Sequence, residues 1–218
     1  MVKSTDDRVH KLQFEKTKII DRFAIFVIRT ASNYFWVVVD ILSHQNNKIA
    51  DYYESSIGKE YEKECKTFQI LKGNKILHIG CGSYPLTEMT IARLFEVNVV
   101  GIDKSKKAVK RANEVILKKH YDKKITINQG NGATFPVEEF DIIIVSSCAL
   151  PKKDILNHIF SKAKKNSILI IRDLDMATGE ILDCVNEHKK NITIEKRINH
   201  PVPIMLPIGW NAFHLKKK

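Results

Sequence analysis

The sequence is poor in the residue patterns that mark several common classes of protein. Its four cysteines are scattered without a CxxC pair, which argues against a disulfide framework or a zinc site and predicts reduced thiols in a cytoplasmic protein. Its eight histidines form no i, i+4 pair or dense cluster, so no metal site is expected. The polar, charged residues 1–13 do not resemble a signal peptide.

The sequence also lacks a long uncharged run of apolar residues. Its most apolar stretch, residues 19–42, contains four charged residues, and the uncharged part, residues 30–39, is shorter than the ~20 residues of a bilayer-spanning helix. We therefore expect a buried helix and no membrane partner. Apolar residues recur there at spacings of three and four, and the side expected to pack on the rest of the protein consists of Phe23, Phe26, Val27, Tyr34, Val37, Val38 and Ile41.

Acidic residues are too few to balance the basic ones. The 36 lysines and arginines exceed the 25 aspartates and glutamates, which gives a formal charge of +11. A basic surface can attract RNA, phosphorylated substrates or acidic lipid at long range. Few aromatic residues are interleaved with the lysines and no arginine-rich cluster is present, so no motif indicates the RNA partner that the net charge alone would allow.

Glycine is scarce, with nine in the chain, yet two of them stand close together after a short apolar run. Residues 76–79 predict a strand, Gly80-Cys81-Gly82 a tight turn, and the apolar spacing after Pro85 a helix over residues 86–95. Because glycine lacks a Cβ, such a turn lets the backbone touch a ligand, and the N–H groups at the helix start face it. The pattern favours a flat, polar ligand.

An acidic residue follows at the distance expected for a ribose contact. Residues 97–102 predict a second buried strand, and Asp103 stands at its carboxyl end, about 20 residues past the glycines. The glycine turn and this acid together predict an adenosine site. Tyr84 and Pro85 occupy the region where a dinucleotide-binding turn has its third glycine, which disfavours a pyrophosphate.

These two motifs resemble those of the class I S-adenosylmethionine-dependent methyltransferases. Their first motif is similar to Ile-Leu-His-Ile-Gly-Cys-Gly at residues 76–82, and their second to Val-Val-Gly-Ile-Asp at residues 99–103. The resemblance implies an α/β, Rossmann-like sheet of seven mostly parallel strands with the last strand antiparallel, helices on both faces, and S-adenosylmethionine as cofactor. We expect a helical N-terminal extension over residues 1–70 and the cofactor-binding domain over residues 71–218.

The remaining apolar periodicity completes the expected elements. Helices are predicted over residues 105–120, 153–160 and 178–188, and strands over residues 125–128, 140–145, 166–172, 192–198 and 210–215. The segment 200–209 contains three prolines and several apolar residues, which predicts a stiff wall or lid.

The resemblance also implies which residues contact the cofactor. Asn131 stands where methyltransferases commonly place an acid that accepts from the adenine amino group, and its amide oxygen can accept the same bond. Ser146 and Ser147 follow the fourth strand, where they can touch the methionine part. The full predicted set is His78, Gly80, Cys81, Gly82, Asp103, Lys104, Asn131, Gly132, Ser146 and Ser147.

One departure from the methyltransferase pattern raises a second reaction. His78 replaces the acid usual in the first motif, and the turn continues with Pro85-Leu-Thr87, which is similar to nicotianamine synthases. Those enzymes transfer the 3-amino-3-carboxypropyl arm of S-adenosylmethionine instead of its methyl group. By that resemblance Tyr52, Tyr53 and Glu54 are candidates for handling an acceptor amine, and Tyr84 is a further catalytic candidate.

Three functions therefore stay open. The first is a methyltransferase for a small-molecule acceptor, the second an aminocarboxypropyl transferase that releases methylthioadenosine, and the third a noncatalytic nucleoside- or RNA-binding module. The acid-Pro-Pro-aromatic sequence of amino-methylating nucleic-acid enzymes is absent, which argues against methylation of exocyclic base nitrogens.

Overall fold

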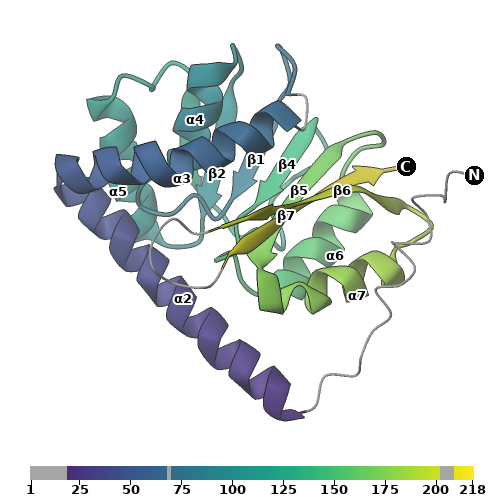
Figure 1. Cartoon of the computed structure of the whole chain (residues 1–218). Helices are drawn as coiled ribbons and strands as arrows, with labels where there is room; N and C mark the ends of the chain where they lie inside the picture. The colour runs from purple at the N-terminus through teal and green to yellow at the C-terminus, as the bar shows by residue number, and fades with distance from the viewer. Residues whose placement is uncertain (1–18, 68–69, 202–208) are drawn as a thin grey trace, which may run out of the picture.

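A seven-stranded sheet forms the centre of the protein, with the strand order β3-β2-β1-β4-β5-β7-β6 (Figure 1). The computed structural model describes residues 19–67, 70–201 and 209–218; parts of the predicted extension and of the proline-rich wall lie outside this description. The strands are β1 Ile76–Ile79, β2 Val99–Asp103, β3 Ile125–Gln129, β4 Ile142–Val145, β5 Ile168–Leu174, β6 Ile192–His200 and β7 Trp210–Lys217. Strands β1 to β5 pair in parallel, and β7 is antiparallel to both β5 and β6.

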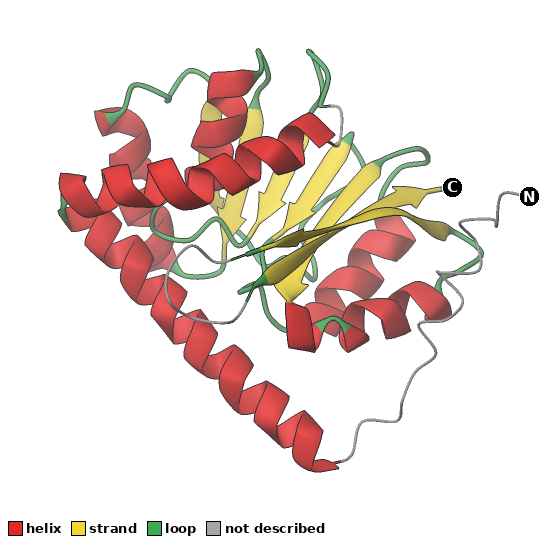
Figure 2. Cartoon of the chain, in the orientation of Figure 1, coloured by secondary structure: helices red, strands yellow, loops and turns green. Residues whose placement is uncertain are grey.

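Helices cover both faces of this sheet (Figure 2). They are α2 Ile19–Gln45, α3 Asn47–Thr67, α4 Leu86–Leu94, α5 Lys106–Lys118, α6 Lys152–Lys162 and α7 Gly179–Glu187, with a short 3-10 turn at Asp175–Ala177. Successive residues of a strand point to opposite faces of the sheet. In β1, Leu77 and Ile79 pack with α6 and α7 on one face, and Ile76 packs with α3 and α4 on the other. The arrangement confirms the predicted Rossmann-like fold.

Helix α2 contradicts the expectation of a buried apolar face. Phe23 and Phe26 are 68% and 65% exposed, Tyr34 is 71% exposed, and Val27, Val37 and Val38 are exposed as well, while Ile41 is half-buried. The segment Phe23–Gln45 is long and apolar enough to cross a bilayer, and none of its most apolar window is buried. The apolar residues lie on one side of α2, but that side faces outward.

Polar contacts explain why the opposite face of α2 packs inward. The Arg29 guanidinium pairs with Asp173 at the end of β5 and with Glu180 of α7, both at 2.7 Å. Near the other end of the helix, His44 contacts Glu114 of α5 at 2.8 Å. Helix α2 thereby runs from α5 towards α7 along one side of the molecule (Figure 1). The spacing of apolar residues in the sequence did not predict these polar contacts of Arg29 and His44.

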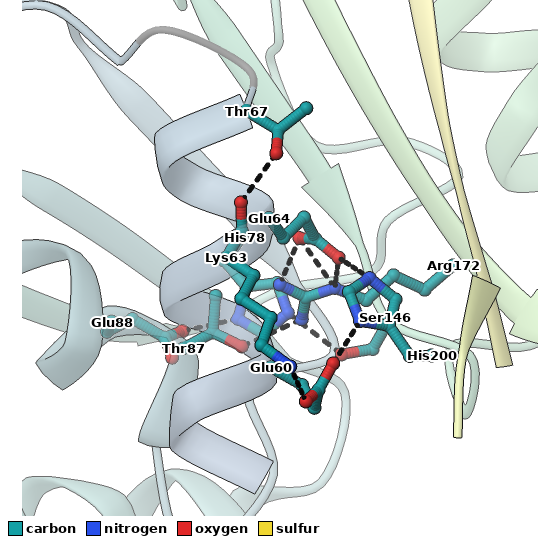
Figure 3. A network of polar contacts seen from close by, with 10 residues as sticks. All are labelled: Glu60, Lys63, Glu64, Thr67, His78, Thr87, Glu88, Ser146, Arg172 and His200. Atoms are coloured by element: carbon teal, nitrogen blue, oxygen red, sulfur yellow. Dashed lines mark hydrogen bonds and ion pairs between the residues drawn. The ribbon is translucent and has the colours of Figure 1, made fainter. Parts of the chain in front are cut away.

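A buried ion pair fastens α3 to the centre of the sheet. Arg172 of β5 is 2% exposed, and its guanidinium donates to both carboxylate oxygens of Glu64 at 2.6–3.1 Å (Figure 3). It also donates to the Thr87 hydroxyl at 2.8 Å and lies 4.0 Å from the centre of the Tyr61 ring. A charge buried this deeply is tolerated because each of the three guanidinium nitrogens donates to one of these partners.

Glu64→Ala should therefore destabilise the fold strongly. The variant leaves the Arg172 charge buried without its carboxylate, which costs about 3–5 kcal/mol of unfolding free energy. Glu62→Ala on the same helix removes a partner of Arg93 and Lys66 at the surface and should cost less than about 1 kcal/mol. Urea unfolding measures both values, and equal losses would contradict the anchoring role of Arg172.

Candidate active site

A cavity of about 640 Å³ lies at the carboxyl ends of the parallel strands. Its floor is the turn after β1 together with the ends of β2, β4 and β5, and its roof comes from α2 and α3. Roof residues include Phe35, Trp36 and Tyr53, and the rings of Trp36 and Tyr53 stack with centroids 6.0 Å apart. This is the edge where open α/β sheets bind ligands, and the volume suits a small molecule.

The glycine turn forms the middle of the cavity floor. Gly80 and Gly82 have φ angles of +87° and +69°, a region that side chains disfavour. The Gly80 N–H donates to the Ile102 carbonyl at 2.8 Å. A Cβ on Gly82 would lie 2.0 Å from an oxygen of Asp40, so only glycine fits beneath that carboxylate.

Asp103 lies at the end of β2, as predicted, and lines the cavity. One of its carboxylate oxygens accepts from the Gly82 N–H at 3.1 Å, and the other accepts from the Ser105 N–H at 2.8 Å. Each oxygen keeps a second acceptor position. The carboxylate is thus held against the glycine turn while retaining capacity for a ribose diol.

The predicted cofactor residues all come together around this cavity. Its lining contains His78, Gly80, Cys81, Gly82, Asp103, Lys104, Asn131, Gly132, Ser146 and Ser147. The Asn131 side-chain oxygen accepts from the Ala133 N–H at 3.0 Å, which leaves it one acceptor position. A Cβ on Gly132 would lie 2.4 Å from a methyl carbon of Ile79, so close packing also requires this glycine. Their contact with a cofactor stays a prediction.

Two of the four catalytic candidates do not reach the cavity. Tyr53 and Tyr84 line it, but Tyr52 is 55% exposed and lies outside, and the Glu54 carboxylate accepts from Tyr84 and Lys119 away from it. Neighbouring residues on a helix point about 100° apart, so three consecutive residues of α3 cannot share one face. The structure therefore brings Tyr53 and Tyr84 to the cavity but not Tyr52 and Glu54, and a catalytic role for these candidates stays a prediction.

Asp40 is a cavity residue that the sequence did not predict. It comes from the inner face of α2 and accepts from the Ser83 N–H at 3.0 Å. Surrounding protein raises the pKa of its carboxyl to about 8, and the nearby charges of Asp103 and Glu88 act in the same direction. The one sign of its role in the sequence was that a charged residue stands within the most apolar stretch. That charge served only as an argument against a membrane-spanning helix.

His78 is held between two side chains from other elements. Its Nδ1 lies 2.7 Å from an oxygen of Glu88 on α4, and its Nε2 lies 2.8 Å from the Ser146 hydroxyl after β4 (Figure 3). His78 is 2% exposed and Glu88 is fully buried. Gly101 of β2 leaves room for Glu88, since a Cβ there would lie 2.5 Å from its carboxylate. In the described part of the chain, no group of three or more potential ligands is arranged to hold a metal ion.

A family model described as a methyltransferase domain matches residues 70–212, more than half of the chain. The protein therefore belongs to this methyltransferase-domain family, and S-adenosylmethionine is accordingly its cofactor. The cavity fits this cofactor, because it combines a glycine turn of positive φ with a carboxylate at the end of β2. No curated protein shows significant sequence similarity to the chain.

Solved structures share the fold at low sequence identity. A mutant of MtNAS in complex with S-adenosylmethionine aligns with a TM-score of 0.72 and 15% identity, over 92% of this chain and 80% of that chain. MtNAS in complex with MTA and tNA aligns with a TM-score of 0.71 and 14% identity, over 92% of this chain and 78% of that chain. A Galdieria sulphuraria protein described as a sarcosine dimethylglycine methyltransferase aligns with a TM-score of 0.57 and 13% identity. The alignment covers 73% of this chain and 84% of that chain. At these identities the likeness shows the fold alone.

Gly82→Ala should weaken cofactor binding as well as stability. The left-handed φ costs an alanine about 1–2 kcal/mol, and its Cβ must also displace the Asp40 carboxylate. Gly73→Ala is the matched control, since its φ is +86° and nothing lies within 4 Å of the added Cβ. We expect similar strain in both, but reduced affinity for S-adenosylmethionine only in Gly82→Ala. Calorimetry and urea unfolding measure the two effects, and unchanged affinity in Gly82→Ala would contradict the site.

Asp40→Asn should change how stability depends on pH. The folded-state pKa of about 8 lies above the ordinary value of 3.8, so ionisation of Asp40 increasingly destabilises the native state as pH rises between these values. Because asparagine cannot ionise, the unfolding free energy of Asp40→Asn relative to the parent should rise across this window. Asp122→Asn, at an exposed position, is the control. Urea unfolding at several pH values measures both, and a pH-independent difference for Asp40→Asn would contradict the raised pKa.

Proposed function

We propose that this protein is an S-adenosylmethionine-dependent transferase that acts on a small molecule bound in the cavity beneath α2 and α3. The observation that carries the proposal is the continuity of the cavity. It extends from Asp103 across the glycine turn to an apolar region lined by Phe35 and Trp36. The two parts match an adenosine subsite and an enclosed acceptor subsite, and the helical roof favours a small acceptor over a macromolecule.

The residues around the glycine turn suit a cationic cofactor. S-adenosylmethionine supplies a sulfonium whose attached carbons are activated, and transfer of one of them discharges the cation. In the proposed complex Asp103 accepts from the ribose hydroxyls, and Asn131 accepts from the adenine amino group. Asp40 and Glu88 place further acidic groups beside the turn. The roof keeps water away while the acceptor is held in line with the reacting carbon.

Methyl transfer is the proposed reaction, because the matched family is a methyltransferase domain. Transfer of the 3-amino-3-carboxypropyl arm is the second candidate, and two observations favour it. The likeness to MtNAS extends over 92% of the chain and so includes residues before the methyltransferase domain. The first motif also has His78 in place of the usual acid and continues into Pro85-Leu-Thr87, as in nicotianamine synthases.

Two experiments test this function. Calorimetry should detect binding of S-adenosylmethionine, and absence of binding at millimolar concentration would remove both reactions. Incubation with candidate small amines and alcohols, followed by mass spectrometry, separates the two reactions by their by-product. Methyl transfer yields S-adenosylhomocysteine, and aminocarboxypropyl transfer yields methylthioadenosine. Binding without either by-product across the acceptor panel would support the noncatalytic nucleoside-binding module.

Asp103→Ala should weaken the binding of S-adenosylmethionine by about 1–3 kcal/mol, because both ribose hydroxyls lose a charged acceptor. Asp103→Asn should lose less, since an amide oxygen still accepts one bond. The exposed Asp122→Ala serves as a matched acid-to-alanine control and should bind like the parent. Calorimetry on the four proteins decides the point: an affinity unchanged by Asp103→Ala would mean that the ribose lies elsewhere.

A further inference from the structure

We propose that Glu88, His78 and Ser146 form a proton-accepting chain that ends in the cavity, and that the Ser146 hydroxyl takes the proton from the acceptor's nucleophile. This inference rests on the proposed function and assigns its missing base. Ser146 is the catalytic residue of the chain, since its hydroxyl is the end of the chain on the cavity side. His78 and Glu88 act through it and are positioning residues.

The first support is geometry. The Glu88 carboxylate lies 2.7 Å from His78 Nδ1, and His78 Nε2 lies 2.8 Å from the Ser146 hydroxyl oxygen. The three side chains come from α4, β1 and the carboxyl end of β4, and dashed lines in Figure 3 mark the two contacts that join them. Glu88 and His78 are buried, whereas Ser146 is half-buried and lines the cavity. An acid, an imidazole and a cavity-facing hydroxyl are thus joined by two short hydrogen bonds.

The second support is that the two contacts allow one consistent set of hydrogen-bond directions. An ionised carboxylate only accepts, so the proposed chain assigns a proton to His78 Nδ1. In a neutral imidazole the other nitrogen then carries a lone pair, so Nε2 accepts from the Ser146 hydroxyl. This tautomer leaves the serine oxygen free to accept a proton from the cavity side. Within the described residues, the second Glu88 oxygen has no hydrogen-bond partner, an arrangement that is costly for structure alone.

The third support is the rigid setting of Ser146. Its N–H donates to the Ile79 carbonyl at 3.0 Å, and its own carbonyl accepts from the Lys152 ammonium at 2.5 Å. A Cβ on Gly80 would lie 3.2 Å from the Ser146 Cβ, so the serine directly adjoins the glycine turn. The hydroxyl is therefore fixed beside the proposed cofactor position.

Charged and titratable groups from several neighbouring elements lie near the chain. Asp40 comes from α2, Asp103 from the end of β2, Cys81 from the glycine turn and Lys152 from α6. Glu88 contributes to the raised pKa of Asp40 and of the Cys81 thiol, which places its charge close to both groups.

The proton and electron balance of the step is complete. The acceptor's nitrogen or oxygen forms a bond to the transferred carbon, and the bond from that carbon to sulfur breaks with its electron pair going to sulfur. The nucleophile's proton passes to the Ser146 oxygen while the hydroxyl's own proton passes to His78 Nε2. The resulting imidazolium is paired with Glu88 and returns the proton to solvent through Ser146 after the product leaves.

Labelling with diisopropyl fluorophosphate tests the chain without any acceptor. The reagent forms a bond from phosphorus to an activated serine oxygen, fluoride leaves, and the hydroxyl proton passes to the histidine. We expect a label on Ser146, assigned against Ser147 by fragmentation of the peptide, and a rate about 100-fold lower in His78→Gln. Glu88→Gln should also label more slowly. His44→Gln, which removes a surface histidine paired with Glu114, should label like the parent.

Imidazole NMR on the parent protein provides a second measurement that needs no core variant. The assigned nitrogen shifts of His78 should show a proton on Nδ1 and a lone pair on Nε2. A proton on Nε2 instead, no label on Ser146, or equal labelling in His78→Gln would overturn the chain. If those results are as expected but S-adenosylmethionine does not bind, the proposed function fails and the activated serine stands. If S-adenosylmethionine binds but Ser146 is not labelled and His78 lacks the expected tautomer, the proposed function stands and the proton-accepting chain fails.

Discussion

The structure depends on the burial of one positive charge in the middle of its sheet. Arg172 of β5 is 2% exposed, and its buried charge is tolerated because Glu64 of α3 neutralises it. The same helix contacts β6 through Glu60 and His200, whose side chains lie 2.9 Å apart (Figure 3). Helix α3 is therefore fixed over the strand ends by charge pairing as well as by apolar packing. From that position α3, together with α2, forms the roof of the cavity.

The acidic environment of the cavity is distributed over several elements. Methyltransferases usually carry an acid in the first motif, but this chain has His78 at that position. Asp40 approaches the turn from α2, Glu88 from α4 and Asp103 from β2. Their shared neighbourhood is evident from the raised pKa of Asp40, to which the charges of both other acids contribute. The replacement of one motif residue thus coincides with contacts between helices and strands far apart in the chain.

What the sequence could predict follows from the range of the interactions. The turn at Gly80 and Gly82 and the acid at Asp103 are local features of one strand-turn-helix unit and the next strand, so their spacing alone predicted the cavity floor. Asp40 contacts Ser83 across more than forty residues, and no local pattern encodes that contact. Periodicity in α2 identified an apolar stripe without showing that Arg29 turns the opposite face inward. Long-range pairing also explains a difference in a strand boundary. The sequence predicted that the fifth strand ends at residue 172, but β5 extends to Leu174 because β7 pairs with it that far.

The placement of β7 has a consequence for the order of folding during synthesis. Among the described strands, β6 pairs with β7 alone, and β7 itself lies between β6 and β5. A nascent chain that has left the ribosome only as far as residue 209 can assemble the five parallel strands, but its β6 has no strand to pair with. Trp210 at the start of β7 also lines the cavity and stacks on His200 with ring centroids 4.8 Å apart. Completion of the binding pocket is thereby coupled to the synthesis and pairing of β7.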